Sequence, residues 1–134
     1  MNKIPYKNMS EDYIREYSDE LDWLMVCREA VLSEPFMREF EHKLQWVWVS
    51  GFQKLSECFM REYSHRIYWM LISKHQNISE DFAEEFKGRI VWWMAVKYQN
   101  FSKEFLEKHK DRIEAENTYI KHTPTPVRFK LDIE

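Results

Sequence analysis

Apolar and polar positions recur along this chain with a period of 23 residues. Units begin at residues 9, 32, 55, 78 and 101, and no insertion breaks their register. The second position of every unit is serine, and the fifteenth is tryptophan in the four complete units. The recurring residues are Ser10, Ser33, Ser56, Ser79 and Ser102, together with Trp23, Trp46, Trp69 and Trp92. Such a period predicts a repeat architecture, because neighbouring units together bury apolar faces that no unit buries alone.

The first half of each unit has the pattern of a helix. Its serine is a preferred N-cap residue, and acidic residues follow at once in the complete units, where they suit the positive end of the helix dipole. Acidic and basic residues also lie four apart, and we expect them to pair within their own helix at roughly 0.2–0.5 kcal/mol each. These pairs are Glu11/Arg15, Glu34/Arg38, Glu57/Arg61, Glu39/Lys43, Glu62/Arg66 and Glu85/Arg89. The pattern predicts a helix of about three turns.

The second half of each unit is a short, almost continuously apolar segment, such as WVWVSGFQK, which fits a buried helix or a buried strand. Steps of three residues through Trp46, Val49 and Phe52 favour a helix of about two turns. The alternative is a leucine-rich-repeat-like α/β unit, whose template these apolar residues also fit. That alternative would expose the recurring tryptophan on a concave strand face, so we favour two helices per unit.

These patterns predict an all-α, solenoid-like array of four and a half units over residues 9–120, preceded by an N-terminal extension at 1–8. Residues 121–134 form a separate tail, in which Pro124 and Pro126 favour extended chain. Apolar residues then alternate with charged ones, as in a half-buried strand, and Phe129 and Leu131 lie on its apolar side. This strand could cover the open end of the array, add to a partner, or exchange between copies in a homo-oligomer.

Composition narrows the function classes. The net charge is −3 and the pI about 6.0, which disfavours a nucleic-acid binder that relies on a broad basic face. The sequence has no uncharged apolar run long enough for a membrane span. Its two cysteines do not make a disulfide framework, so we expect a cytoplasmic protein.

Candidate chemical groups do not form a recognisable catalytic or metal-binding motif. His42 and His65 lie 23 residues apart but not in a metal-ligand spacing, and we expect them to be solvated. Cys27 and Cys58 fall in different halves of different units, and buried fillers are the simpler interpretation. We therefore expect no catalytic residue, no metal and no cofactor, and we interpret the chain as a non-enzyme.

The tryptophans divide into two sets. The four at the recurring position are expected to form a buried ladder that joins adjacent units. Trp48 and Trp93 lie outside it and are candidates for a partner-binding surface, which Phe52 and Tyr68 would enlarge. An alternative use of such aromatics is a stacking platform for nucleotides or nucleic acid.

The unit sequences MSEDYIREY, LSEPFMREF, LSECFMREY and ISEDFAEEF resemble a tandem helical repeat of uncharacterised proteins from phages, large DNA viruses and some bacteria. The second half matches through Trp69, Ile72, Ser73 and Gln76, but Gln45 departs where that repeat has a polar cap. The resemblance implies a helical array of viral or mobile-element origin and supplies no catalytic residue. We predict a non-catalytic protein–protein interaction module, and in its sharper form a phage-type inhibitor that masks a host defence protein. A homo-oligomeric structural protein is the third alternative.

Overall fold

The computed structural model describes residues 4–122, which form a 3-10 helix and ten α-helices and contain no strand. The first helices of the units are α1 (Glu11–Glu16), α3 (Glu34–Glu39), α5 (Glu57–Glu62), α7 (Glu80–Glu85) and α9 (Lys103–Lys108). The second helices are α2 (Trp23–Glu29), α4 (Trp46–Phe52), α6 (Trp69–His75) and α8 (Trp92–Tyr98). Helix η1 (Tyr6–Asn8) precedes the array and α10 (Lys110–His122) follows it. The all-α prediction is therefore confirmed, and the leucine-rich-repeat-like alternative is wrong.

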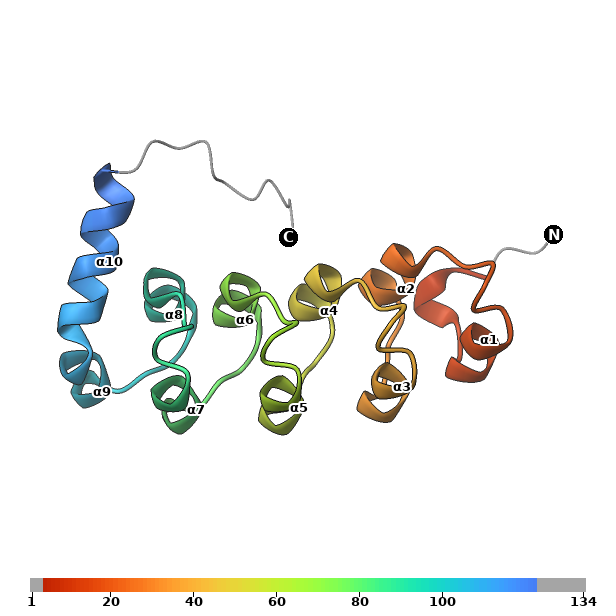
Figure 1. The fold of residues 1–134 in the computed structure, drawn as a ribbon, viewed down its shortest axis with the longest axis horizontal. Coiled ribbons are helices and arrows are strands. Elements are labelled where there is room, and N and C mark those ends of the chain that lie inside the picture. The colour runs from red at the N-terminus through yellow and green to blue at the C-terminus, as the bar shows by residue number, and fades with distance from the viewer. Residues whose placement is uncertain (1–3, 123–134) are drawn as a thin grey trace.

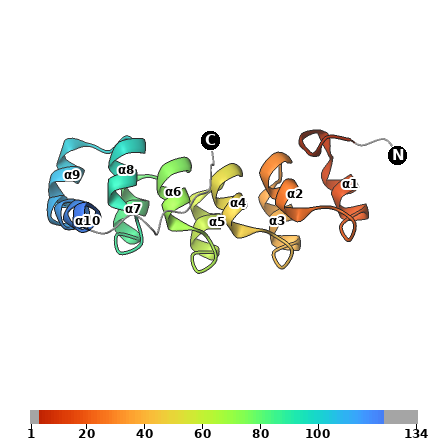
Figure 2. The same cartoon turned by 90° about the horizontal axis from the view of Figure 1, so that it is seen from above.

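The helices form two parallel rows along one long axis (Figures 1 and 2). The second helices pack directly on one another, α2 on α4, α4 on α6 and α6 on α8. The first helices form the other row and are more widely separated, so the array bends toward the side of the second helices (Figure 1). Helix α10 packs on α8 and rises above the second-helix row at one end (Figure 1).

Two predicted lengths differ from the structure. Each first helix has six residues, fewer than the three turns expected. In the complete units, the chain turns back at once after an aromatic C-cap residue. At Phe40, for example, the carbonyl accepts hydrogen bonds from Lys43 and Leu44, and this turn brings Leu44 into the core. The fifth unit continues into the thirteen-residue helix α10, which extends past the expected boundary at residue 120 to His122. The expected strand, with Phe129 and Leu131, lies outside the described residues.

The core lies between the two rows and repeats from unit to unit. Phe36, Phe59 and Phe82 are almost completely buried, and the tryptophan of the preceding unit packs on each of them. Centroid distances are 6.4, 6.1 and 6.0 Å for the rings of Trp23, Trp46 and Trp69, respectively. Aromatic pairs at such separations contribute about 0.5–1.5 kcal/mol beyond area burial. The ring contacts thus join adjacent units as expected, and Trp92 extends them onto Phe105 and His109, but only Trp92 is buried, whereas the other three tryptophans are half-buried.

Candidate functional site

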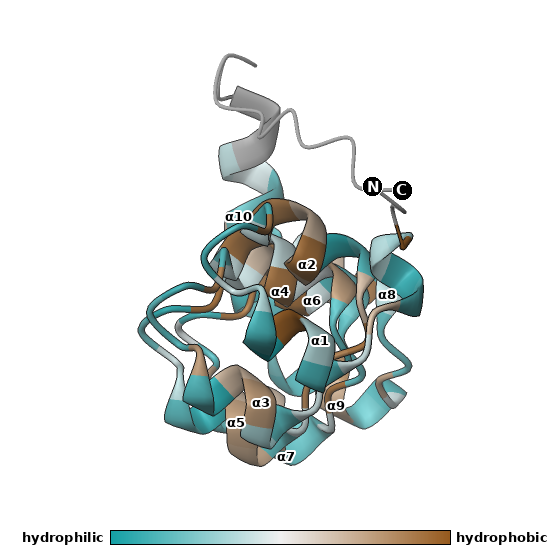
Figure 3. Ribbon diagram, turned by 90° about the vertical axis from the view of Figure 1, so that its right-hand side faces the viewer, coloured by the Kyte–Doolittle hydropathy of each residue, from teal (hydrophilic) through white to brown (hydrophobic). Residues whose placement is uncertain are grey.

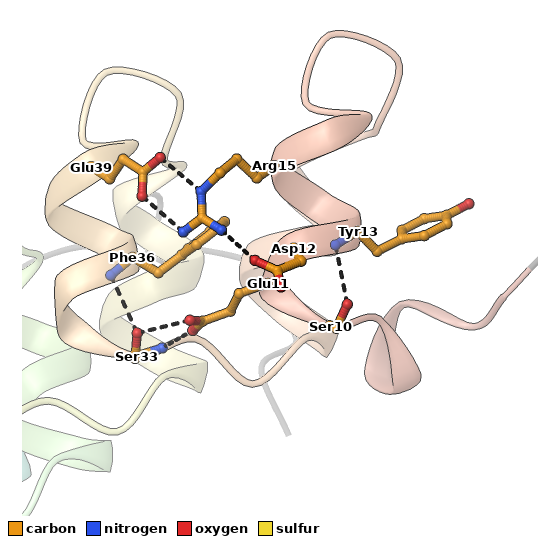
Figure 4. A network of polar contacts seen from close by, with 8 residues as sticks. All are labelled: Ser10, Glu11, Asp12, Tyr13, Arg15, Ser33, Phe36 and Glu39. Carbon is orange, nitrogen blue, oxygen red and sulfur yellow. Dashed lines mark hydrogen bonds and ion pairs between the residues drawn. The ribbon is translucent and has the colours of Figure 1, made fainter.

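The polar side chains that recur in each unit connect it to the next one. Ser10 caps α1 by accepting from the Tyr13 N–H, as every recurring serine does in its unit. Glu11 accepts from the Ser33 N–H and hydroxyl, at 2.5 and 3.1 Å (Figure 4). The same contact joins Glu34 to Ser56, Glu57 to Ser79 and Glu80 to Ser102. The serine caps are thus confirmed, and the acid that follows each serine caps the next unit.

The expected ion pairs within single helices are mostly wrong. Of the expected pairs, only Arg61 and Glu57 are in contact, at 4.0 Å. Arg15 pairs with Glu39 of the next unit through two hydrogen bonds of 2.9 Å (Figure 4). Equivalent pairs join Arg38 to Glu62 and Arg61 to Glu85. For Arg15, Arg38 and Arg61, the carboxylate four residues earlier already accepts hydrogen bonds from a serine. Each of these arginines therefore pairs with a carboxylate of the neighbouring unit.

A glutamine ladder runs through the interior. The buried Gln76 amide donates to the Ser50 and Gln53 carbonyls, at 2.9 and 2.6 Å, and its Oε1 accepts from the Leu55 N–H at 3.0 Å. Gln53 and Gln99 make the same three contacts in their units. The sequence prediction gave these glutamines no structural role, although their regular spacing of 23 residues was a signal that could have revealed one.

The second helices receive their N-terminal caps from the preceding unit. The Ser50 hydroxyl donates to the Trp46 carbonyl and accepts from the Tyr68 N–H at 3.0 Å, where no side chain of the same helix caps α6. Ser73 does the same for Val91. Cys27 occupies the equivalent position, with its sulfur 3.4 Å from the Gln45 nitrogen. Neighbouring units thus supply the polar caps that the second helices otherwise lack.

Both ends of the array are completed by special residues. At the N-terminal end, Asp22 caps α2 with its own side chain, and its N–H donates to the Tyr6 hydroxyl of η1 at 3.1 Å. At the other end, the Glu116 carboxylate of α10 accepts from the Trp92 and Trp93 N–H groups at 3.0 and 2.9 Å. These contacts close the array within the described residues.

The solvent side of the second helices does not take part in these ladders. Helical spacing places four positions of each second helix on this side, which we call the second-helix face. It comprises Leu24, Met25, Arg28 and Glu29; Val47, Trp48, Gly51 and Phe52; Met70, Leu71, Lys74 and His75; and Trp93, Met94, Lys97 and Tyr98. In every second helix, the first two of these four face residues are apolar. Seven of the resulting eight apolar residues are only half-buried. Helices α2 and α4 are coloured largely as hydrophobic in Figure 3.

The predicted site residues are partly brought together on this face. Trp48 and Phe52 stack at 5.7 Å on α4, and the Arg28 guanidinium carbon lies 5.6 Å from the Trp48 ring centroid. Tyr68 is 40% exposed at the start of α6, and Trp93 is half-buried on α8. Phe129 and Leu131 lie outside the described residues. A hollow of about 430 Å³ opens between the C-terminal ends of α4 and α6, with Phe52, Lys54 and His75 among its lining residues.

Charge is divided unequally between the rows. The first helices of the complete units carry eleven acidic and three basic residues, whereas the second helices carry one acidic residue, Glu29, and three basic ones, Arg28, Lys74 and Lys97. His75 adds little charge at neutral pH, because burial and the adjacent Lys74 lower its pKa. The second-helix face is therefore apolar and weakly basic, on a chain that is acidic overall.

Other candidate groups take ordinary places in the fold. Burial raises the pKa of the Cys27 thiol to about 11, although the Gln45 N–H opposes this, so the group is neutral at pH 7. Cys58 is exposed, so its interpretation as a buried filler is wrong. His42 is exposed beside Glu41, and His65 contacts Arg89. In the described part of the chain, no three potential ligand side chains gather around a common point. None of its helices is both long and apolar enough to cross a bilayer.

Comparison with known proteins gave no match to a family model, a curated protein or a solved structure. The function must consequently be inferred from the arrangement of this chain's own residues. Its central feature is the second-helix face, where apolar and basic side chains remain accessible after the inter-unit contacts have been made.

Proposed function

We propose that the chain is a non-catalytic protein–protein interaction module that docks a partner protein on the second-helix face. The observation that carries this proposal is that the first two face residues of all four second helices are apolar. Contiguous, partly exposed apolar surface of this kind is typical of interaction sites. Its composition, with Trp48 and Trp93 among methionines and aliphatic residues, resembles that of interface cores.

The way in which the array is held together supports the same function. The recurring polar residues are engaged in contacts between units, where they stabilise the scaffold. A scaffold of this type presents an extended, preorganised surface, which reduces the ordering cost of association. A catalytic acid or base is commonly found in a cleft, with a strongly shifted pKa. Among the described residues, the pKa of Glu84 is strongly lowered, but Glu84 lies in an ion-pair cluster between units.

The sharper proposal is a phage-type inhibitor that acts in the cytoplasm of a host cell by covering the surface of a defence protein. Its support is the resemblance of the unit sequences to repeats from phages and large DNA viruses. The described array, a small scaffold with a partly apolar face, is suited to masking another protein because masking needs shape and surface but no chemistry.

Site-specific photo-crosslinking tests the interaction module. A benzophenone amino acid is placed at Met70 on the second-helix face, or at Asp12 on the opposite row, where the carboxylate is 94% exposed. Each full-length variant is irradiated in an extract of the cells in which the chain acts. We expect a discrete protein adduct from Met70 and none from Asp12. The absence of an adduct at Met70, or equal labelling at both positions, would contradict the proposal.

A further inference from the structure

We propose that the second-helix face binds an acidic segment of its partner protein, with Arg28, Lys74 and Lys97 as the carboxylate-binding residues. This inference rests on the proposed interaction function and specifies the chemistry of the partner.

The three cations are held in place by aromatic rings and not by carboxylates. The Arg28 guanidinium carbon lies 5.6 Å from the centroid of Trp48 and 5.8 Å from that of Phe52. The ammonium groups of Lys74 and Lys97 each lie 5.4 Å from the centroid of Tyr98. Among the described residues, no acidic side chain forms an ion pair with any of the three. Cation–π contacts therefore help to orient these side chains, and within the described residues their N–H groups make no hydrogen bond to another side chain or to the backbone.

The first-helix row provides an internal comparison. Arg15 lies over the Phe36 ring at 5.4 Å, yet it also makes two hydrogen bonds to Glu39. An arginine stacked on a ring therefore binds a carboxylate with its free edge in this same fold. On the second-helix face Arg28 has the ring but lacks the carboxylate, which a partner would supply.

Repeat symmetry aligns these cations. Arg28, Lys74 and Lys97 occupy one repeat position, and their helices pack side by side, so they lie in a row along the array. Packed helices are about 8–10 Å apart, which equals roughly three residues of extended chain. The second unit has Gly51 at this position, and the exposed Lys54, which follows α4, lines the same hollow as Gly51. An extended segment with an acidic residue at every third position would match the row, and its apolar residues could contact Trp48 and its neighbours.

Charge complementarity favours this occupant over the alternatives. Arg28 lies over the Trp48 ring, and Lys74 and Lys97 lie over the Tyr98 ring, so a nucleobase that stacked on either ring would compete with these cations. In a second copy of this chain, the acidic side chains of the first helices are largely engaged by serines and arginines. The tail at 121–134 carries more basic than acidic residues and does not complement a basic face.

The test measures binding of a fluorescein-labelled peptide of four Glu-Leu-Ser repeats by fluorescence anisotropy with the full-length protein. Probes for comparison are the Gln-Leu-Ser peptide and a labelled oligothymidylate of twelve nucleotides. The variant Arg28→Glu/Lys74→Glu/Lys97→Glu reverses the row. Its matched control, Lys103→Glu/Lys110→Glu/Arg112→Glu, makes the same change of net charge at exposed residues outside the face.

We expect the glutamate peptide to bind more tightly than the glutamine peptide, and its affinity to fall as NaCl is raised from about 50 to about 200 mM. Reversal of the row should weaken binding at least tenfold, and the control should change it less than twofold. If the triple variant does not show the wild-type circular dichroism spectrum, the single Lys97→Glu variant replaces it, with an expected weakening of about threefold.

Several results would overturn the inference. These are equal binding of the two peptides, equal effects of the row variant and its control, no peptide binding, or tighter binding of the oligothymidylate with dependence on the same cations. Light scattering could also show that the wild type self-associates and that the Arg28→Glu/Lys74→Glu/Lys97→Glu variant does not, while the control variant still does. This result would identify a second copy as the occupant. Crosslinking at Met70 that survives the row variant would leave the interaction module standing while this inference fails.

Discussion

The glutamine ladder allows a quantitative test of what holds adjacent units together. Replacing Gln76 by methionine keeps the length and approximate volume of the side chain but removes its three hydrogen bonds. The Ser50 and Gln53 carbonyls lose a donor, and the Leu55 N–H loses its acceptor, in an interior where Gln76 is only 6% exposed. A buried polar group left without a partner costs about 1–3 kcal/mol, so the three groups together should lower the free energy of unfolding by roughly 3–9 kcal/mol.

The chain offers a matched control in Gln45, which is exposed and makes no side-chain cap contact. Gln45→Met should change the free energy of unfolding by no more than about 0.5 kcal/mol. Urea unfolding followed by circular dichroism measures both variants, and the comparison requires that the denaturant dependence, the m-value, remains that of the wild type. A loss below about 1 kcal/mol for Gln76→Met, at unchanged m-value, would refute the role given to the ladder.

Three further predictions concern single contacts. Cys27→Ser should stabilise the protein by about 0.5–1.5 kcal/mol in urea unfolding, because the new hydroxyl can make both contacts that Ser50 makes in the next unit; a lower stability would contradict this. Hydrogen bonding from Lys108, aided by neighbouring cations, lowers the pKa of Glu84 to about 2, so its stabilising effect is complete above the ordinary value of 4.5 and lost as pH falls toward 2. The Tm difference between wild type and Glu84→Gln should therefore close over that range, and a constant difference would oppose it. Glu116→Ala should lower the Tm and speed hydrogen exchange at the start of α8 before that of α4, whereas uniform exchange would argue against an end cap.

The repeat, its two-helix unit and its aromatic core could be predicted from the sequence because each depends on local periodicity. Serine caps act within one helical turn, and the fixed spacing of tryptophan and phenylalanine reports burial against a neighbour. Pattern alone was sufficient for these features. The use of Trp48 and Phe52 in partner binding stays a prediction, and the structure brings the two side chains together on the second-helix face.

The partners of the charged residues could not be predicted in the same way. Glu34 and Arg38 satisfy the local rule for an ion pair, yet Glu34 is taken by Ser56 and Arg38 by Glu62. The choice between partners four and 24 residues apart depends on the distance between units, which no sequence pattern measures. The cations of the second-helix face were missed for a related reason, since Arg28 becomes distinctive only when it is seen to lack a carboxylate.

The caps that each unit lends to its neighbour have a consequence for how such a chain can change in length. All these contacts span sequence separations of about one unit, as between Gln53 and Gln76 or between Glu34 and Ser56. Duplication of 23 interior residues would preserve each of them and add one more rung, whereas an insertion of any other length would mismatch the caps on both sides. Only the termini need residues of their own, as at Tyr6 and Glu116. Unequal recombination within the gene could thus lengthen or shorten the second-helix face by whole 23-residue units, while both ends of the array keep their caps.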